Sequence, residues 1–251
     1  MTSPRLLIIQ PSESDPVGAL GDWLVEAGAE LDIRLPGRQD LPADTEGYGG
    51  VICLGGEMGA HDDAEHPWLA DVRRLLARVA AARVPTLGVC LGAQLLAAAT
   101  GGKVEVGERG PEVGPSLVTK KDAAWTDPLF AELPLIQDVM QFHNDVITRL
   151  PAGAELLASA PRYPHQAFRF NRCVYGVQFH IETTPDIVAL WAAEEPEMAE
   201  LTRPGVFERD ALIASHADIA ETWRPFAHRF VQLVKGELEP AADSQRTLPL
   251  A

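Results

Sequence analysis

The first hundred residues alternate short apolar runs with helical patterns, and this alternation restricts the chain to few folds. Apolar runs bounded by turn residues lie at 5–10, 31–35, 50–54 and 85–89. Apolar residues at helical spacing lie between or after these runs, at 17–27, 66–83 and 91–100. Strands that alternate with helices are typical of βαβ units, which place parallel strands in one sheet. The sequence therefore predicts an α/β fold with a mostly parallel sheet.

Shorter strand patterns follow in the second half of the chain. They lie at 116–119, 136–142 and 155–159, and in a hairpin at 166–179 that turns at Asn171-Arg172. Helices are predicted from 185 to about 195 and across 209–235. A single domain is therefore expected over residues 1–237, followed by a mobile tail at 238–251.

Composition narrows the classes of partner. With 251 residues and 46% hydrophobic residues, the chain has the make-up of one soluble globular domain. The formal charge of −15 argues against binding to nucleic acid or to an anionic membrane, since both would repel the average surface. Three cysteines are an odd number in a chain with no apolar run long enough for a membrane span and no signal-peptide pattern, so we expect a cytoplasmic protein.

Cys90 is the first candidate for chemistry, because it lies at a predicted strand-to-helix junction between Gly88 and Gly92. Such a turn is sharp, and flanking glycines permit packing that a side chain would block. The helix N-terminus would favour the thiolate over the thiol. A buried structural cysteine is the alternative, and it remains the interpretation for Cys53 and Cys173.

His180 and Glu182 are the candidate partners of this nucleophile. A thiolate needs a base, and the base needs an acceptor that fixes its tautomer. If residues 174–180 form a strand, His180 and Glu182 point to the same face, because strand side chains alternate. Taken alone, a His-x-Glu pair at a strand end is more often a solvated feature of the rim.

Two motifs together resemble a known family. GVCLGAQ at 88–94 is similar to the nucleophile motif of the class I, triad-type glutamine amidotransferases, and VQFHIE at 177–182 is similar to their QFHPE motif, with Ile181 in place of proline. The resemblance is greatest to stand-alone proteins related to the glutaminase domain of GMP synthase. It implies a three-layer sandwich with a central, mostly parallel, flavodoxin-like sheet and a small antiparallel hairpin region, and it implies catalysis by Cys90, His180 and Glu182.

The resemblance also implies an oxyanion hole. Gly55-Gly56, which end the third predicted strand, resemble the G-G-P loop of the family, with Glu57 in place of proline. On this chain the oxyanion donors would be the N–H groups of Gly56 and Leu91, and Gly55 would line the substrate pocket. A plain tight turn is the alternative interpretation of these glycines.

The remaining substrate-binding candidates are also implied by the family. Gln94 lies one helical turn after Cys90 and matches a glutamine that holds the amino-acid end of the substrate. Residues 141–145 resemble a loop that lines the glutamine pocket, although Phe142 and Asn144 depart from its usual pattern. We therefore expect His143, Asn144 and Asp145 in the pocket, with a plain turn as the alternative.

The sequence indicates neither a metal nor a cofactor. The other histidines show no ligand spacing that would suggest zinc, and no phosphate-binding loop motif occurs. Asp62-Asp63 and Glu194-Glu195 are interpreted as solvated charges.

Three hypotheses about function follow from these observations. The first is hydrolysis of the glutamine side-chain amide, with ammonia passed to a separate synthetase subunit or acceptor. The second keeps the same residues and replaces glutamine by another γ-glutamyl amide, such as a γ-glutamyl-polyamine. The third is a non-catalytic binding module on the same fold, since a fold does not fix function.

Overall fold

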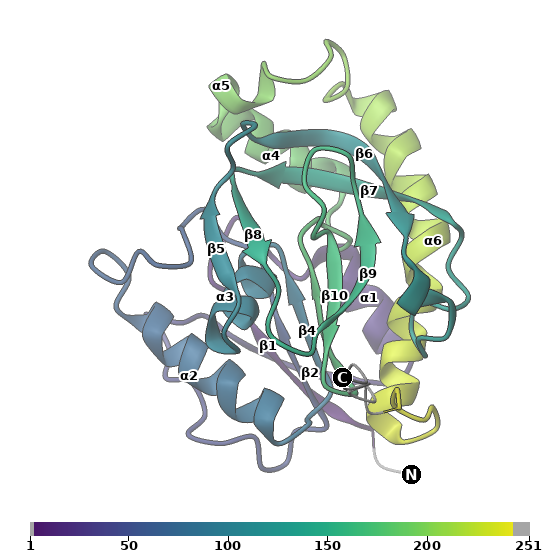
Figure 1. Ribbon diagram of the computed structural model, residues 1–251. Coiled ribbons are helices and arrows are strands. Elements are labelled where there is room, and N and C mark those ends of the chain that lie inside the picture. Colours follow the sequence, from purple (N-terminus) through teal and green to yellow (C-terminus); the bar gives the residue numbers. More distant parts are fainter. Residues whose placement is uncertain (1–2, 243–251) are drawn as a thin grey trace, which may run out of the picture.

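A nine-stranded sheet forms the centre of the molecule, with helices on both of its faces (Figure 1). The computed structural model describes residues 3–242. The strands run in the order β2-β1-β3-β4-β11-β10-β9-β6-β7, and β5 and β8 form a separate two-stranded sheet. The strands are β1 (Arg5–Ile9), β2 (Glu30–Arg34), β3 (Gly50–Cys53), β4 (Thr86–Val89), β5 (Lys103–Val106), β6 (Glu112–Lys120), β7 (Ile136–His143), β8 (Asp145–Arg149), β9 (Glu155–Ser159), β10 (Ala167–Phe170) and β11 (Val174–Val177). The helices are α1 (Gly18–Glu26), α2 (Trp68–Ala81), α3 (Leu91–Ala99), the 3₁₀ turn η1 (Asp122–Trp125), α4 (Pro185–Glu194), α5 (Pro196–Ala199) and α6 (Arg209–Lys235).

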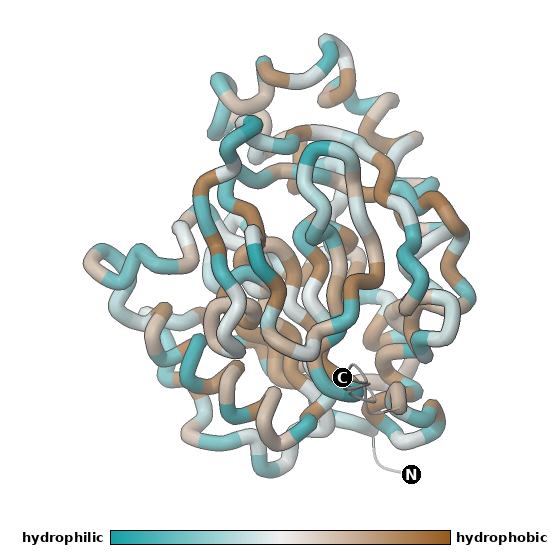
Figure 2. The backbone as a smooth tube through the Cα atoms, in the orientation of Figure 1, coloured by the Kyte–Doolittle hydropathy of each residue, from teal (hydrophilic) through white to brown (hydrophobic). Residues whose placement is uncertain are grey.

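The first five strands of this order are parallel and separate two hydrophobic cores. Strand β1 shows why, since successive side chains of a strand point to opposite faces. Leu6 and Ile8 pack into the core on the side of α1 and α6, whereas Leu7 and Ile9 pack into the core on the side of α2 and α3. Figure 2 shows the apolar strands inside and the polar residues outside. The predicted three-layer α/β fold is confirmed.

The antiparallel part of the sheet is larger than the predicted hairpin. Strands β10, β9, β6 and β7 continue the sheet beyond β11, and β6 begins at Glu112 where the sequence predicted 116. Gly114 and Pro115 hid this extension, because both residues are poor strand formers. Pro115 is tolerated because β6 pairs at this point only with β7, so that its missing N–H interrupts no ladder on the other side. The short strands β5 and β8 were not predicted at all.

The parallel strands bring their carboxyl ends to one edge of the sheet. The segments that follow β1, β3, β4 and β11 carry Asp15, Gly55-Gly56, Cys90 and His180 respectively. Ligands of open α/β sheets bind at this edge.

One predicted boundary near this edge was wrong. The hairpin predicted to end at residue 179 has its second strand, β11, end at Val177. His180 is instead held by Met140 of β7, whose carbonyl accepts from the His180 N–H at 2.8 Å and whose N–H donates to the His180 carbonyl at 3.2 Å. The orientation of His180 is therefore set by a tertiary contact that no local pattern reveals.

The C-terminal part packs on the body of the domain. Helix α6 has the predicted bounds and buries Trp223, Phe226 and Phe230. The first residues of the predicted tail lie against the sheet, because Ala241 donates to and accepts from Arg172. Residues 243–251 of that tail lie outside the described residues. No helix among the described residues is long and apolar enough to cross a bilayer.

Candidate active site

Cys90 lies in the turn between β4 and α3 with an unusual backbone. Its φ of 49° and ψ of −110° are rare for a residue with a side chain, and such strain is typical of functional sites. The Cys90 N–H donates to the Val177 carbonyl at 2.8 Å, which ties the turn to the end of β11.

The two flanking glycines have steric reasons. A Cβ on Gly92 would collide with the carbonyl oxygen of Cys53. A Cβ on Gly88 would lie 2.6 Å from the carbonyl oxygen of Gly92. Helix α3 therefore packs closely against β3 and β4, which lifts Cys90 to the edge of the sheet.

His180 and Glu182 form a buried pair. Glu182 Oε1 lies 2.6 Å from His180 Nδ1, and Glu182 Oε2 accepts from the Ile181 N–H at 2.9 Å. The carboxylate is thus fixed at both oxygens. The second ring nitrogen, His180 Nε2, is buried and has no hydrogen-bond partner among residues 3–242.

The charges around His180 favour its protonated form. Burial lowers the pKa of the imidazolium, but the Glu182 carboxylate and the Cys90 sulfur outweigh burial and raise the pKa of His180 well above its ordinary value. The Trp191 ring, 4.7 Å from the His180 ring between centroids, covers the imidazole from the side of α4.

Gly55 and Gly56 bring the loop after β3 against this group. A Cβ on Gly55 would lie 2.7 Å from Asp15 Oδ2 and 3.1 Å from His180 Cε1, so no larger residue fits there. Within residues 3–242, neither the Gly56 N–H nor the Leu91 N–H has a hydrogen-bond acceptor. Both donors are free for an external oxygen.

Asp15 is a site residue that the sequence analysis missed. Asp15 is only 8% exposed, and its side chain has no hydrogen bond or ion pair with any described residue. Burial, the main cause, and repulsion by Glu182, Glu57 and Glu194 raise the pKa of Asp15 to about 7, although His180 acts in the opposite direction. The sequence signal that could have identified Asp15 is its position in the loop after β1, the first parallel strand.

Gln94 and Gln178 connect the nucleophile to the neighbouring chain. Gln94 Nε2 donates to the Asp145 carbonyl at 2.9 Å and lies 3.4 Å from Gln178 Oε1. Gln178 Nε2 in turn lies 4.0 Å from Cys90 Sγ. Gln94 lines the pocket, but its amide group already has protein partners, and Gln178 was not predicted.

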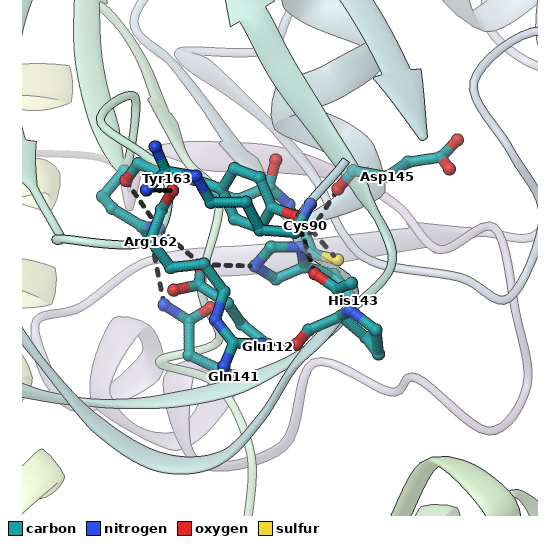
Figure 3. Close-up of polar contacts among 12 residues, drawn as sticks. Cys90, Glu112, Gln141, His143, Asp145, Arg162 and Tyr163 are labelled. Atoms are coloured by element: carbon teal, nitrogen blue, oxygen red, sulfur yellow. Dashed lines mark hydrogen bonds and ion pairs between the residues drawn. The ribbon is translucent and has the colours of Figure 1, made fainter. Parts of the chain in front are cut away.

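The predicted loop at 141–145 is the junction of two strands. His143 ends β7 and Asp145 begins β8, with Asn144 between them. Figure 3 shows His143 between Glu112 and Asp145: its Nδ1 lies 3.0 Å from the Asp145 carbonyl oxygen and its Nε2 lies 3.3 Å from Glu112 Oε2. Both ring nitrogens of His143 thus face protein groups, and Glu112 was not predicted.

These residues surround one cavity of about 730 Å³. Seven predicted residues line it, namely Gly56, Cys90, Gln94, His143, Asn144, Asp145 and His180. Gly55, Leu91 and Glu182 are not among the lining residues. Asp62, Glu194 and Glu195, interpreted from the sequence as solvated charges, also reach the cavity. The described residues contain no group of three or more side chains that could hold a metal ion.

Comparison with known proteins places the chain in a family. A family model described as glutamine amidotransferase class-I matches residues 20–187, which is more than half of the chain. The chain belongs to the class I glutamine amidotransferase family.

Relatives of this glutamine amidotransferase domain include glutamine-hydrolysing GMP synthases. That of Lactococcus lactis subsp. cremoris (strain SK11) is 35% identical over 135 residues, which are 53% of this chain and 24% of the relative. That of Staphylococcus aureus (strain JH9) is 34% identical over 135 residues, with the same coverage. The chain thus spans about a quarter of the length of these relatives.

Solved glutamine amidotransferase structures share the fold over nearly the whole chain. One from Thermotoga maritima has a TM-score of 0.80 and 27% identity, and covers 92% of this chain and 100% of its own. One from Methylobacillus flagellatus has a TM-score of 0.79 and 25% identity, and covers 98% of this chain and 100% of its own.

Proposed function

We propose that this amidotransferase hydrolyses the side-chain amide of glutamine through a γ-glutamyl thioester on Cys90. The observation that carries the proposal is the placement of His180, which has Glu182 on one ring nitrogen and interacts electrostatically with the Cys90 sulfur in the same cavity. Such an arrangement supplies a nucleophile, a base and an orienting carboxylate.

In the proposed mechanism, Cys90 Sγ attacks the amide carbon and the C–N bond breaks. His180 gives its proton to the leaving nitrogen, and a water molecule then hydrolyses the thioester with His180 as base. Glu182 holds the imidazole in position and stabilises its charge. The free N–H groups of Gly56 and Leu91 are suited to stabilise the oxyanion. Gln94, Asn144 and Asp145 would contact the amino-acid end of the substrate, and Gly55 and His143 would shape the pocket.

The destination of the nitrogen is a further part of the proposal. The relatives named above are GMP synthases that hydrolyse glutamine, which supports a separate synthetase as the acceptor of ammonia. We place the protein in the cytoplasm, because its three cysteines are free and a reducing compartment keeps them so.

Replacement of the nucleophile tests the proposal. Cys90→Ala should abolish the release of ammonia and glutamate from glutamine, whereas Cys173→Ala, at another buried free cysteine, should retain it. Iodoacetamide should label Cys90 far faster than Cys53 or Cys173, because burial raises the pKa of both these thiols. Equal labelling rates together with no turnover would favour a non-catalytic binding module.

A second candidate function is hydrolysis of larger γ-glutamyl amides. Cavities of about 300–1,000 Å³ enclose drug-sized ligands. The cavity of about 730 Å³ falls in this range and is larger than glutamine requires.

A further inference from the structure

Apart from the His180 imidazolium, the charged side chains that line the cavity are all acidic. Six carboxylates reach it, from Asp15, Glu57, Asp62, Asp145, Glu194 and Glu195. No lysine or arginine of the described chain is among the lining residues. The rest of the wall is partly apolar, with Met58, Val106, Phe142, Trp191 and Met198. Such a wall suits a ligand with a positive charge on an aliphatic chain.

Five of the six carboxylates fall into two groups. Asp145 is repelled by Asp62. Asp15 is repelled by Glu57 and Glu194. We call the first pair the loop-side carboxylates and the other three the His180-side carboxylates, since Asp15 and the His180 ring contact the same point above Gly55.

The proposed reaction places one group of carboxylates near each end of the substrate. The leaving nitrogen takes its proton from His180, so its substituent must extend from Cys90 toward the His180 side. The α-ammonium of the glutamyl group then lies near the loop-side carboxylates, beside Gln94. A substrate with a second ammonium on its leaving amine would satisfy both groups.

Asp15 independently indicates a missing cation. It is more than nine-tenths buried, lines the cavity, and has no hydrogen-bond or ion-pair partner in residues 3–242. An unpaired buried carboxylate is costly and is normally compensated by a partner. A cationic group of a ligand bound in the cavity would supply that partner.

We propose that the physiological substrate is a γ-glutamyl amide of a diamine or polyamine, whose distal ammonium is bound by Asp15, Glu57 and Glu194. This inference rests on the proposed chemistry of Cys90 and develops the second candidate function, in which an amine leaves in place of ammonia. Hydrolysis breaks the amide C–N bond, releases the amine with a proton from His180, and yields glutamate when water cleaves the thioester.

The test compares two substrates that differ only in this charge. One is mono-γ-glutamyl-1,4-diaminobutane, and the other is γ-glutamyl-n-pentylamine, in which a methyl group replaces the terminal ammonium. Because charge-assisted hydrogen bonds are among the stronger ones, kcat/KM should be higher for the charged amide by at least about tenfold. Equal values would overturn the proposal.

Variants assign the preference to the His180-side carboxylates. Glu194→Gln should reduce the ratio of the two kcat/KM values, and Asp15→Asn with Glu194→Gln should bring it near one. Glu197→Gln, an exposed glutamate that does not line the cavity, is the matched control and should leave the ratio unchanged. If the double variant does not fold, Glu57→Gln with Glu194→Gln serves in its place. An unchanged ratio in the folded double variants contradicts the proposal.

The same ratio has a pH dependence that isolates Asp15, since the ionisation of Cys90 and His180 affects both substrates equally. Asp15 faces His180, Glu182, Glu57 and Glu194 and has a pKa raised to about 7, so the ratio should fall as the pH drops below 7. Asp15→Asn should remove this fall.

Two failures are distinguishable. Turnover of glutamine and of both amides at similar rates overturns only the amine proposal. No turnover of any of the three and no acylation of Cys90 overturns the proposed function as well.

Discussion

The Glu182 carboxylate fixes His180 through a 2.6 Å contact to Nδ1. We expect Glu182→Gln to lower kcat by about 10²–10⁴-fold with a smaller effect on KM, because an amide neither stabilises the imidazolium nor enforces its tautomer. Steady-state kinetics with glutamine measure the effect. Glu197→Gln is the control, and an unchanged kcat in Glu182→Gln would contradict the assigned role.

We predict that the ionised Asp15 carboxylate lowers the free energy of unfolding at neutral pH. In the unfolded chain this carboxyl ionises near its model value of 3.8, whereas in the folded protein its pKa is raised to about 7. Between these values the folded state binds the extra proton, so the free energy of unfolding falls as the pH rises, and the loss is complete above about 7. Asp15→Asn removes this loss.

Chemical denaturation at two pH values measures this difference. Since one pKa unit corresponds to about 1.4 kcal/mol, Asp15→Asn should raise the free energy of unfolding at pH 8 by up to about 4 kcal/mol. At pH 4 the gain should nearly vanish. A destabilised variant at pH 8 would show that the ionised carboxylate has a partner within the protein.

At this scale the sequence predicted much of the site but not all of it. Cys90, His180 and Glu182 carry motif signals because chemistry restricts their residue types. Asp15 and Gln178 carry none on their own, because their roles arise from neighbours far away in the chain. Trp191 was likewise invisible, since a helical tryptophan is ordinarily a core residue.

Among the elements, the β4–α3 turn depends most on the absence of a Cβ atom at Gly92. Gly92→Ala should lower the free energy of unfolding by about 3 kcal/mol or more, because its Cβ would meet the backbone of β3, which cannot rotate away. Ala98→Gly, in the last turns of the same helix, should cost only about 1 kcal/mol. Urea denaturation of both variants makes the comparison, and equal losses would contradict the steric argument.

The elements of the parallel half were predicted well for a physical reason. Their strands are buried on both faces and their helices have clear apolar stripes, so local pattern and tertiary environment agree. Strands β5 and β8 contain charged and exposed residues and are defined mainly by pairing with each other. The end of β11 was predicted wrongly because the bridge between His180 and Met140 is a tertiary contact, which no local sequence pattern reveals.

Across the whole molecule, a buried ion pair supports the antiparallel half of the sheet. Arg169 Nε donates to Asp127 Oδ2 at 2.8 Å, and Asp127 Oδ1 accepts from the N–H groups of Leu129 and Phe130 at 2.9 and 3.1 Å. Burial raises the pKa of Asp127 despite this ion pair. Arg169→Leu should therefore lower the free energy of unfolding by about 3–5 kcal/mol.

The double variant Asp127→Asn with Arg169→Leu is the control for that loss. It should recover part of the stability at neutral pH, because no unpaired charge remains buried. Thermal and urea unfolding provide the measurements. A double variant less stable than Arg169→Leu would show that the carboxylate acts mainly through its bonds to Leu129 and Phe130.

The most direct measurement is acid quenching of the enzyme during turnover of a γ-glutamyl amide, followed by mass spectrometry of its peptides. A γ-glutamyl group should be found on the peptide that carries Cys90, and it should be absent from Cys90→Ala and from the peptides of Cys53 and Cys173. Turnover without any adduct on Cys90, or glutamate release that persists in Cys90→Ala, would contradict the account.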